Sequence, residues 1–597
     1  MRLILSFLFC VSFAFSQSDN QAKIAYQFYQ NGEYEKAIEI YKKLSTSSNF
    51  HVHYHNYFQS LIHAGYYQEA KRLSRRMIRK FPSKLIYIVD LYICQYSDND
   101  IRGSTQTLDQ IYSKIVDVES QVMNVANTFI RYQKYEEALS CYLLFKHLDI
   151  ENKRLYNTQV AQIYQYLGKD EEMIEEYLSL LEKDPSQKNS VMFYLQKYLD
   201  NNGIYSEKNY ELVRDALLIY SQQEKTSSLF SELLIWMFMQ NNEFELAFLQ
   251  AKSLDRRLNE DGERIYEIAE VFSENRYYDI AIRAYDYIIG KGSSNYYFID
   301  AYIDKLYVMQ LVENPDVIEI DRLYQSIIEQ MGRNVSTVSL LNHYAYFKAF
   351  SLSDLEGSKI ILEDIMQMYQ VSKMDLAECK LVYADVMLLS GNVWTALLYY
   401  SQVEKDHKEE PIGHEAKLRR AKISYYKGDF KWAQSQLDIL KASTSKLIAN
   451  DAMELSLLIT DNLNLDTSEV PMRIYAAADL LYYQGDYVGS INKLDSILSH
   501  YPSHSLVDDI YFRKHKIYLD MHDIDSAIYM LQKLCAGYSF DILYDDALFE
   551  LANIYQFKKS DINKALKYYE MILFKCKGSI YLVESRKRYR ELRGDKL

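Results

Sequence analysis

The chain has 597 residues, which is more than one hydrophobic core usually supports, so it needs several domains or a repeat array. Hydrophobic residues make up 48% and charged residues 25%, as in ordinary folded proteins, which excludes disorder over most of its length. A net charge of −14 without a basic domain argues against nucleic-acid binding. The 6 prolines and 18 glycines are too few for the turns of an all-β fold, so long helices are expected.

The N-terminus has the pattern of a secretory signal peptide. Arg2 precedes an apolar run from Leu3 to Phe15, and Ala14 and Ser16 place small residues at −3 and −1 of a cleavage site. Residues 1–16 are therefore predicted to be removed, which changes the net charge to 67 − 82 = −15. The run is short for a membrane span, although an uncleaved anchor is the alternative interpretation.

The first predicted repeat unit follows the signal peptide. An apolar stripe over residues 25–29 marks one helix, and Ala37, Tyr41 and Leu44 share one face of the next. Gly32 can end the first helix because glycine accepts a positive φ. The small alanine lets the two helices approach closely, and the tyrosine fills the space to the neighbouring unit. Such a unit cannot bury its apolar faces alone and must stack on others.

The second predicted unit begins with a cluster of histidines. His51 and His55 lie at positions i and i+4, a spacing that can place two imidazoles on one metal ion. They are the candidate metal ligands of the sequence. The alternative is a helix terminus whose histidines are solvated, and no cofactor is predicted.

One phrase recurs along the chain. It consists of a small residue, any residue, an aromatic, two variable residues, alanine, three variable residues and then tyrosine or another apolar residue. Its alanine recurs at intervals of roughly 34 residues, from Ala37 to Ala70 and from Ala247 to Ala281, and at about twice that interval from Ala70 to Ala138. The residues predicted to pack the repeats together are Ala37, Tyr41, Ala70, Ala138, Tyr142, Tyr177, Ala247, Ala281, Tyr285, Ala396, Tyr400, Ala433, Ala527, Ala565 and Tyr569.

The repeats change along the chain. Units at about 104, 210, 318 and 357 are degenerate, and a break near 369–375 predicts an N-terminal array over 17–375 and a C-terminal array over 376–597. The later units are longer, because the step from Ala527 to Ala565 exceeds the step from Ala247 to Ala281. The interval from Ala433 to Ser490 is longer still, which predicts an extra helix over 450–461 and a loop over 462–471.

The C-terminus is a basic segment in an acidic protein. Residues 575–597 hold eight Lys or Arg against three acidic residues. One interpretation is a solvated helix that caps the last repeat. The other is a docking edge for an acidic partner or another subunit, with Tyr581, Arg586, Arg588 and Arg590 as the candidate docking residues.

Eleven phrases in one register resemble the tetratricopeptide-repeat (TPR) family, whose unit is about 34 residues long and consists of two antiparallel helices. Pro82, Pro185 and Pro502 each lie at the same offset after the alanine position, where that family often ends its second helix. The resemblance implies an all-α solenoid of stacked antiparallel helix pairs, with two sub-arrays, that binds other proteins. The lengthened units resemble envelope TPR proteins of Gram-negative bacteria, and the tail and signal resemble exported TPR proteins of Bacteroidota.

The sequence contains no catalytic signature such as a nucleophile elbow, GxxxxGK[ST], GxGxxG or HExxH, so no enzymatic activity is predicted. The leading hypothesis is a non-catalytic scaffold, in the periplasm or at the periplasmic face of the outer membrane. Tyrosines and charged residues on its concave surface would bind peptides or envelope proteins. Neither nucleic-acid partners nor a transmembrane segment after signal cleavage is expected.

Glycan or nutrient binding is the alternative function. Starch-utilisation lipoproteins of Bacteroidota also carry TPR helices, beneath a glycan-binding insert. This chain departs from them because it has only 3 Trp, no Gly- and Asn-rich insert and no suitable context for a lipid-anchor cysteine. Shared helices alone do not establish this function.

Overall fold

The structure is a computed structural model, and it describes residues 20–45, 50–115, 121–148, 156–200, 206–222, 227–442, 445–464 and 468–595. The predicted signal peptide over 1–16 lies outside these residues. Every regular element in the described ranges is a helix and none is a strand, which confirms the predicted all-α class. In the same ranges, no helix combines the length and apolar character needed to cross a membrane.

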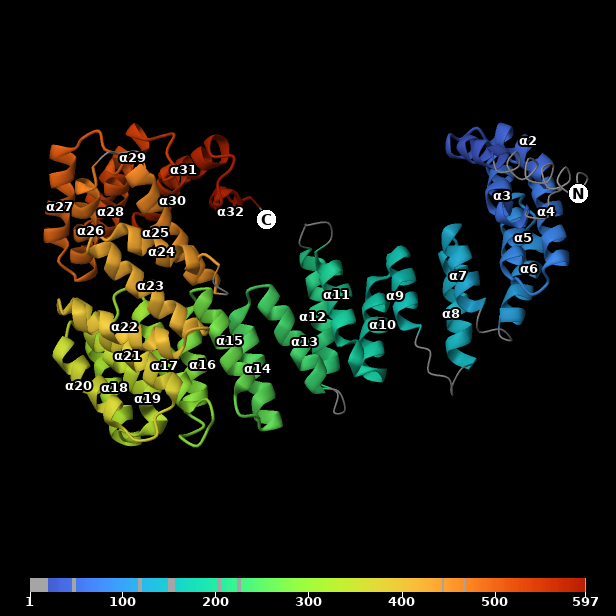
Figure 1. Cartoon of the computed structure of the whole chain (residues 1–597). Helices are drawn as coiled ribbons and strands as arrows, with labels where there is room; N and C mark the ends of the chain where they lie inside the picture. Colours follow the sequence, from blue (N-terminus) through green and yellow to red (C-terminus); the bar gives the residue numbers. More distant parts are fainter. Residues whose placement is uncertain are drawn as a thin grey trace, which may run out of the picture. The chain divides into compact units, whose positions relative to one another are not determined.

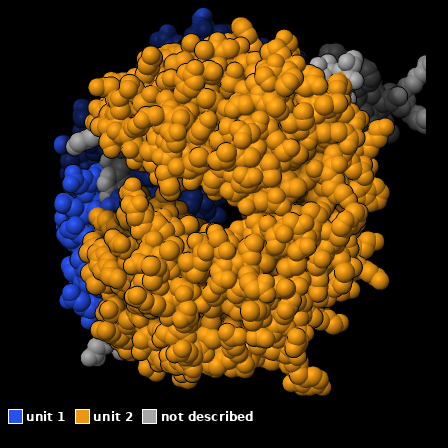
Figure 2. All heavy atoms as spheres, turned by 90° about the vertical axis from the view of Figure 1, so that its left-hand side faces the viewer, with its two compact units in different colours: residues 1–241 blue, residues 242–597 orange. Residues whose placement is uncertain are grey.

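The chain forms two compact units, residues 1–241 and 242–597 (Figures 1 and 2). Unit 1 opens with a helix over 20–30 and continues as a series of helical hairpins. Its further helices are α2 (Tyr34–Leu44), η1 (Phe50–Val52), α3 (Tyr54–His63), α4 (Tyr67–Lys80), α5 (Ile86–Ser97), α6 (Ile101–Ile115), α7 (Val122–Arg131), α8 (Tyr135–Leu148), α9 (Asn157–Tyr166), α10 (Asp170–Lys183), η3 (Pro185–Gln187), α11 (Lys188–Leu199), α12 (Glu207–Ser221) and α13 (Ser227–Gln240).

Unit 2 contains the longer repeats. Its helices are α14 (Phe244–Leu258), α15 (Glu263–Glu274), α16 (Tyr278–Ile289), α17 (Phe298–Leu311), α18 (Val317–Met331), η5 (Val335–Thr337), α19 (Val338–Phe350), α20 (Leu355–Gln367), α21 (Lys373–Leu389), α22 (Val393–Asp406), α23 (Pro411–Tyr426), α24 (Phe430–Leu440), α25 (Lys446–Asn464), α26 (Val470–Tyr483), α27 (Tyr487–His500), α28 (Val507–Asp520), α29 (Ile524–Gly537), α30 (Tyr544–Asn553), the π-helix η6 (Ile554–Lys558), α31 (Ile562–Lys575) and α32 (Leu582–Arg593). Consecutive helices pack as hairpins, for example α21 with α22 and α28 with α29.

The division between the units differs from the division predicted near residues 375 and 376. Residue 375 lies in the first turn of α21, and one hydrophobic core continues across it from Phe298 to Ile423. The contact boundary lies instead after Asn241, between α13 and α14. The break seen in the sequence is therefore a turn between α20 and α21, which pack directly against each other.

A residue with positive φ precedes the second helix of many hairpins. Gly428 and Gly485 take this position with φ of 76° and 78°, and His522 takes it with φ of 58°. In these three hairpins an aspartate then caps the helix; Asp486, for example, accepts a hydrogen bond from the N–H of Gly489 (2.9 Å). This bond satisfies one of the free N–H groups at the helix start.

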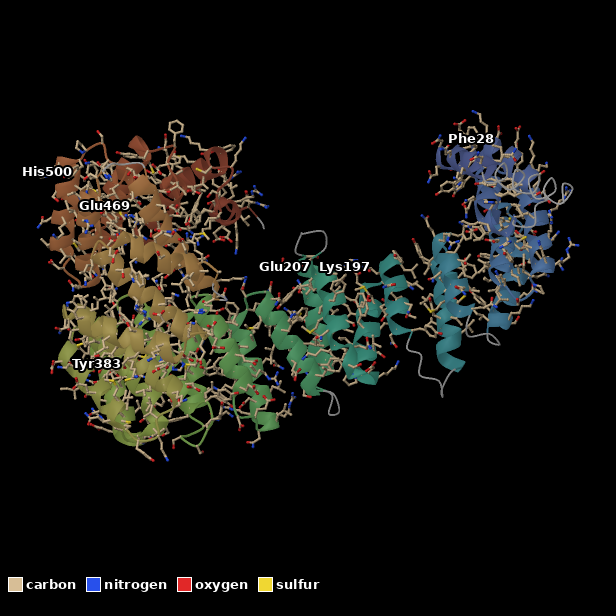
Figure 3. The ribbon with its side chains drawn as sticks, in the orientation of Figure 1. Phe28, Lys197, Glu207, Tyr383, Glu469 and His500 are labelled. Carbon is tan, nitrogen blue, oxygen red and sulfur yellow. The ribbon has the colours of Figure 1, made fainter. Side chains whose placement is uncertain are left out.

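The alanine and tyrosine positions lie in the core. Every residue predicted to pack the repeats together is at most 2% exposed. The tyrosine hydroxyls need acceptors when they are buried. Tyr400 donates to Asp385, Tyr569 donates to Gln556 (2.7 Å), and the less buried Tyr383, labelled in Figure 3, donates to Glu363 (3.0 Å).

We expect replacement of Ala527 by leucine to lower the free energy of unfolding by roughly 1–3 kcal/mol, because the larger side chain overpacks a helix interface. Ala527 is 0% exposed in α29. Ala536→Leu is the matched control, since Ala536 lies on the exposed side of the same helix. Denaturant unfolding measures both variants, and equal curves would contradict the assigned interface.

We expect Gly485→Ala to destabilise the protein by about 1 kcal/mol, because alanine is strained at positive φ. A methyl group there meets no atom within 4 Å, so the cost is that of the backbone alone. Gly537→Ala is the control, since Gly537 is helical with equally open surroundings. Alanine favours the helix there and should stabilise by up to about 1 kcal/mol. Thermal melts that shift in the same direction for both variants would contradict this account.

Candidate binding groove

A groove of about 990 Å³ lies within unit 2. Its lining comes mainly from α23, α26, α28 and α30, which are the first helices of successive hairpins, and from the inserted helix α25. The space-filling view in Figure 2 shows that unit 2 is hollowed on the face drawn there. The volume is at the upper end of what protein binding sites usually enclose.

The inserted helix α25 forms one wall of the groove. It packs against α23, α24 and α26, and it presents Asp451, Glu454 and Leu457 to the groove. The predicted helix over 450–461 is extended at both ends to Lys446–Asn464. At its C-terminus, the Asn462 side chain donates to Asp509 (2.8 Å), which connects this wall to α28. Of the predicted loop over 462–471, residues 465–467 lie outside the described residues, α25 continues to Asn464 and α26 already begins at Val470.

Buried ion pairs connect neighbouring first helices at the same sequence spacing in two places. Arg419 of α23 pairs with Asp385 of α21 (2.5 Å), and Arg513 of α28 pairs with Asp479 of α26 (2.9 Å). Burial raises the pKa of both carboxyl groups, and the neighbouring guanidinium groups oppose that rise. Tyr425 completes the second pair by donating to Asp479 (2.8 Å). Repeat stacking therefore brings the same two helix positions, one acidic and one basic, into contact in both places.

The remaining charge in the groove is mostly negative. Lys422 lies 3.5 Å from Asp451, and Lys516 lies over the ring of Phe512. Among the described residues, no Lys or Arg lies within 4.0 Å of the other lining carboxylates. These are Glu454, Asp461, Asp508, Asp509, Asp541, Asp546 and Glu550.

The carboxyl groups at the start of α28 are crowded and poorly hydrated. Burial, together with the charge of Asp541, raises the pKa of Asp508 to about 6. Burial and the charge of Asp508 raise the pKa of Asp509 to about 8, although the hydrogen bond from Asn462 opposes this rise. Desolvation penalises the charged form, so these groups hold protons more tightly than a solvated aspartate.

Tyrosine and aliphatic side chains line the rest of the groove. The tyrosines are Tyr425, Tyr426, Tyr475, Tyr482, Tyr483, Tyr538 and Tyr581. Leu457 of α25 and Ile542 before α30 also line it, and their side chains are 45% and 69% exposed. Rigid aromatic rings with polar hydroxyls and exposed aliphatic groups are typical of surfaces that bind peptides.

The structure separates the predicted docking residues of the C-terminus into two kinds. Tyr581 stacks on Phe549 with ring centroids 4.3 Å apart and donates to Asp546 (2.7 Å). Arg588 donates to Asn553 (2.6 Å). Tyr581 and Arg588 therefore hold α32 on the last repeat, whereas Arg586 and Arg590 are exposed.

The predicted histidine pair does not share one uninterrupted α-helix. His51 lies in the 3₁₀ turn η1, and His55 lies in α3, which begins at Tyr54. Burial and the charge of Arg131 lower the pKa of His55. Within the part of the chain that the structure describes, no three His, Cys, Asp or Glu side chains are placed to hold a metal ion. The spacing rule assumed a continuous helix that the chain does not form here.

Sequence reasoning missed the carboxylates of the groove. One signal could have found them, since adjacent aspartates occur at 508–509 and again at 545–546, which is one lengthened unit apart. Equivalent positions of successive repeats become neighbours when the repeats stack. The two aspartate pairs were thus visible as a recurring acidic position.

The helix pairs and their groove define an α-helical repeat protein. No family model matches the sequence, and no curated protein matches it. Similar solved structures include Naa15/Naa10 bound to HypK-THB (13% identity, 97% of this chain and 96% of that chain, TM-score 0.29) and yeast Tom70 (14%, 92% and 99%, 0.27). A tetratricopeptide repeat protein from Parabacteroides merdae is another (10%, 48% and 97%, 0.26). At these low identities and TM-scores, the similarity to solved structures assigns no function to the chain.

We expect the protein to lose stability as pH rises from about 4 to about 8, because the pKa of Asp509 is about 8 in the folded state and near 4 when unfolded. The folded state binds the proton more tightly in this window, so deprotonation favours unfolding. Asp509→Asn should raise the melting temperature at pH 8 and flatten its pH dependence. Glu329→Gln, at an exposed position of unit 2, is the control. A variant that follows the wild-type pH profile would contradict the assignment.

Proposed function

We propose that the protein is a non-catalytic scaffold that binds an extended segment of another protein in the groove of unit 2. We further propose that it acts after export, in the periplasm or at the periplasmic face of the outer membrane, with envelope proteins as partners. The observation that carries the binding proposal is the groove of about 990 Å³ with its lining of tyrosines and exposed aliphatic side chains. The export proposal is supported by the signal-peptide pattern of residues 1–16.

The shape of the groove suits a polypeptide segment. Its lining comes from several successive repeats, so one bound chain would contact many of them at once. Leu457 and Ile542 offer apolar contacts, and the tyrosine hydroxyls and carboxylates offer hydrogen bonds. Peptide grooves in proteins combine these two kinds of contact, because apolar contacts supply affinity and polar contacts fix register.

The lining of the groove gives less support to glycan binding. None of the three tryptophans, Trp236, Trp394 and Trp432, lines the groove. The glycan-binding alternative therefore lacks a specific supporting observation in this groove.

We expect a photo-crosslinking amino acid at Leu457 to join the protein to a discrete partner in intact cells, because this side chain lines the groove. The matched control carries the same amino acid at Leu447, which is 79% exposed on the same helix but does not line the groove. Mass spectrometry of the crosslinked peptides identifies the bound segment. The same partners at both positions, or none at Leu457, would contradict binding in the groove. Fractionation of the cells tests export, which a cytoplasmic pool alone would exclude.

A further inference from the structure

The groove of unit 2 is hollow, lined by tyrosine, and short of positive charge. We infer that it takes a partner segment carrying lysine or arginine, whose cation lies against Asp508, Asp509 and Asp541. The inference rests on the proposed function and names the chemistry of the partner. Charge, burial and the way in which the chain neutralises another carboxylate of the same groove support it.

The carboxylates that line the groove outnumber its lysine and arginine side chains. Nine carboxylates line it against Lys422, Arg513 and Lys516. Arg513 pairs with Asp479 and Lys422 lies against Asp451, so those two cations are already engaged. Lys516 lies over the ring of Phe512 and acts on Asp546 and Glu550 from beyond ion-pair distance. In the described part of the chain, the carboxylates at the starts of α28 and α30 have no cation within ion-pair distance.

Asp508 is a buried carboxyl group that has no lysine or arginine within ion-pair distance among the described residues. The residue is 5% exposed, and burial and the charge of Asp541 both raise the pKa of its carboxyl group. The N-termini of α28 and α30 partly offset this charge. The raised pKa values of Asp508 and Asp509 show that the offset is incomplete. A cation placed between these carboxylates would reduce their mutual repulsion and would compensate for the water that they lose on burial.

Another buried carboxylate of the groove, Asp479, is neutralised by side chains of the protein itself. Asp479 receives a guanidinium from Arg513 and a hydroxyl from Tyr425, and the guanidinium of Arg513 lies 5.6 Å from the ring centre of Tyr482. Near the start of α30 the tyrosine is present, because Tyr581 donates to Asp546 (2.7 Å). Lys516 opposes the rise in the pKa of Asp546 from beyond ion-pair distance, and no arginine or lysine of the described residues pairs with Asp546 directly. The partner would supply this missing cation.

The surroundings favour an amino-acid cation over a metal ion. Nowhere among the described residues do three His, Cys, Asp or Glu side chains form a possible metal site. Tyrosine faces suit a guanidinium or ammonium group, which they attract through the ring quadrupole. Exposed Phe540 and Ile542, in the turn between α29 and α30, offer apolar contact beside the carboxylates. A segment that alternates cationic and aliphatic residues matches both features.

The test uses the full mature chain and fluorescence anisotropy at low salt. The first probe is a fluorescein-labelled short peptide in which lysine alternates with leucine and glycine. Two further probes carry glutamine or glutamate in place of every lysine. The tested variant is Asp508→Asn/Asp541→Asn, and the matched control is Glu313→Gln/Glu329→Gln, which removes the same charge from exposed positions of unit 2 outside the groove.

We expect the lysine probe to bind at least about tenfold more tightly than the glutamine probe, and the Asp508→Asn/Asp541→Asn variant to lose that preference while the control keeps it. Equal affinity for the lysine and glutamine probes would overturn the inference and leave peptide binding intact. Equal loss in both variants would also overturn it, because it would indicate general attraction to an acidic protein. Failure of all three probes to bind would contradict the proposed function of the groove as well.

Discussion

The structure depends on one constraint, which is that a single helical hairpin cannot cover its own apolar face. Alanines such as Ala281 and Ala527 are fully buried because neighbouring helices approach each other at these points. Tyrosines such as Tyr285 fill the wider gaps between units. Stacking is therefore required for folding, and every other feature of unit 2 is arranged around the resulting repeat of first helices.

The same stacking creates the chemistry of the groove. Because successive first helices pack side by side in the same register, Asp385 meets Arg419 and Asp479 meets Arg513. Asp508 and Asp509 at the start of α28 and Asp546 at the start of α30 have no arginine or lysine within ion-pair distance among the described residues, and the groove is negative there. Structural cohesion and recognition thus use different positions of the same first helices, and in the second case the counter-charge would come from the partner.

The sequence predicts the fold better than the site. The alanine and tyrosine register, the glycine turns and the inserted helix follow from local pattern, because each depends on residues within one unit. The unit boundary after Asn241 depends on contacts between units, and so does the use of Arg588 to bind Asn553. The paired aspartates at 508–509 were visible, but their burial depends on how α25, α28 and α30 pack together.

The inserted helix α25 has a consequence for how such a protein can change. The first helices α23 and α26 contact each other directly, so the register of the array passes between them independently of α25. The insertion therefore adds a wall to the groove beside a direct contact between the first helices α23 and α26. Gain, loss or exchange of one helical segment at this junction is therefore an evolutionary route to a new ligand preference on the same framework of first helices. For the same reason, the junction between α24 and α26 is a suitable place to graft a new helix in a designed receptor.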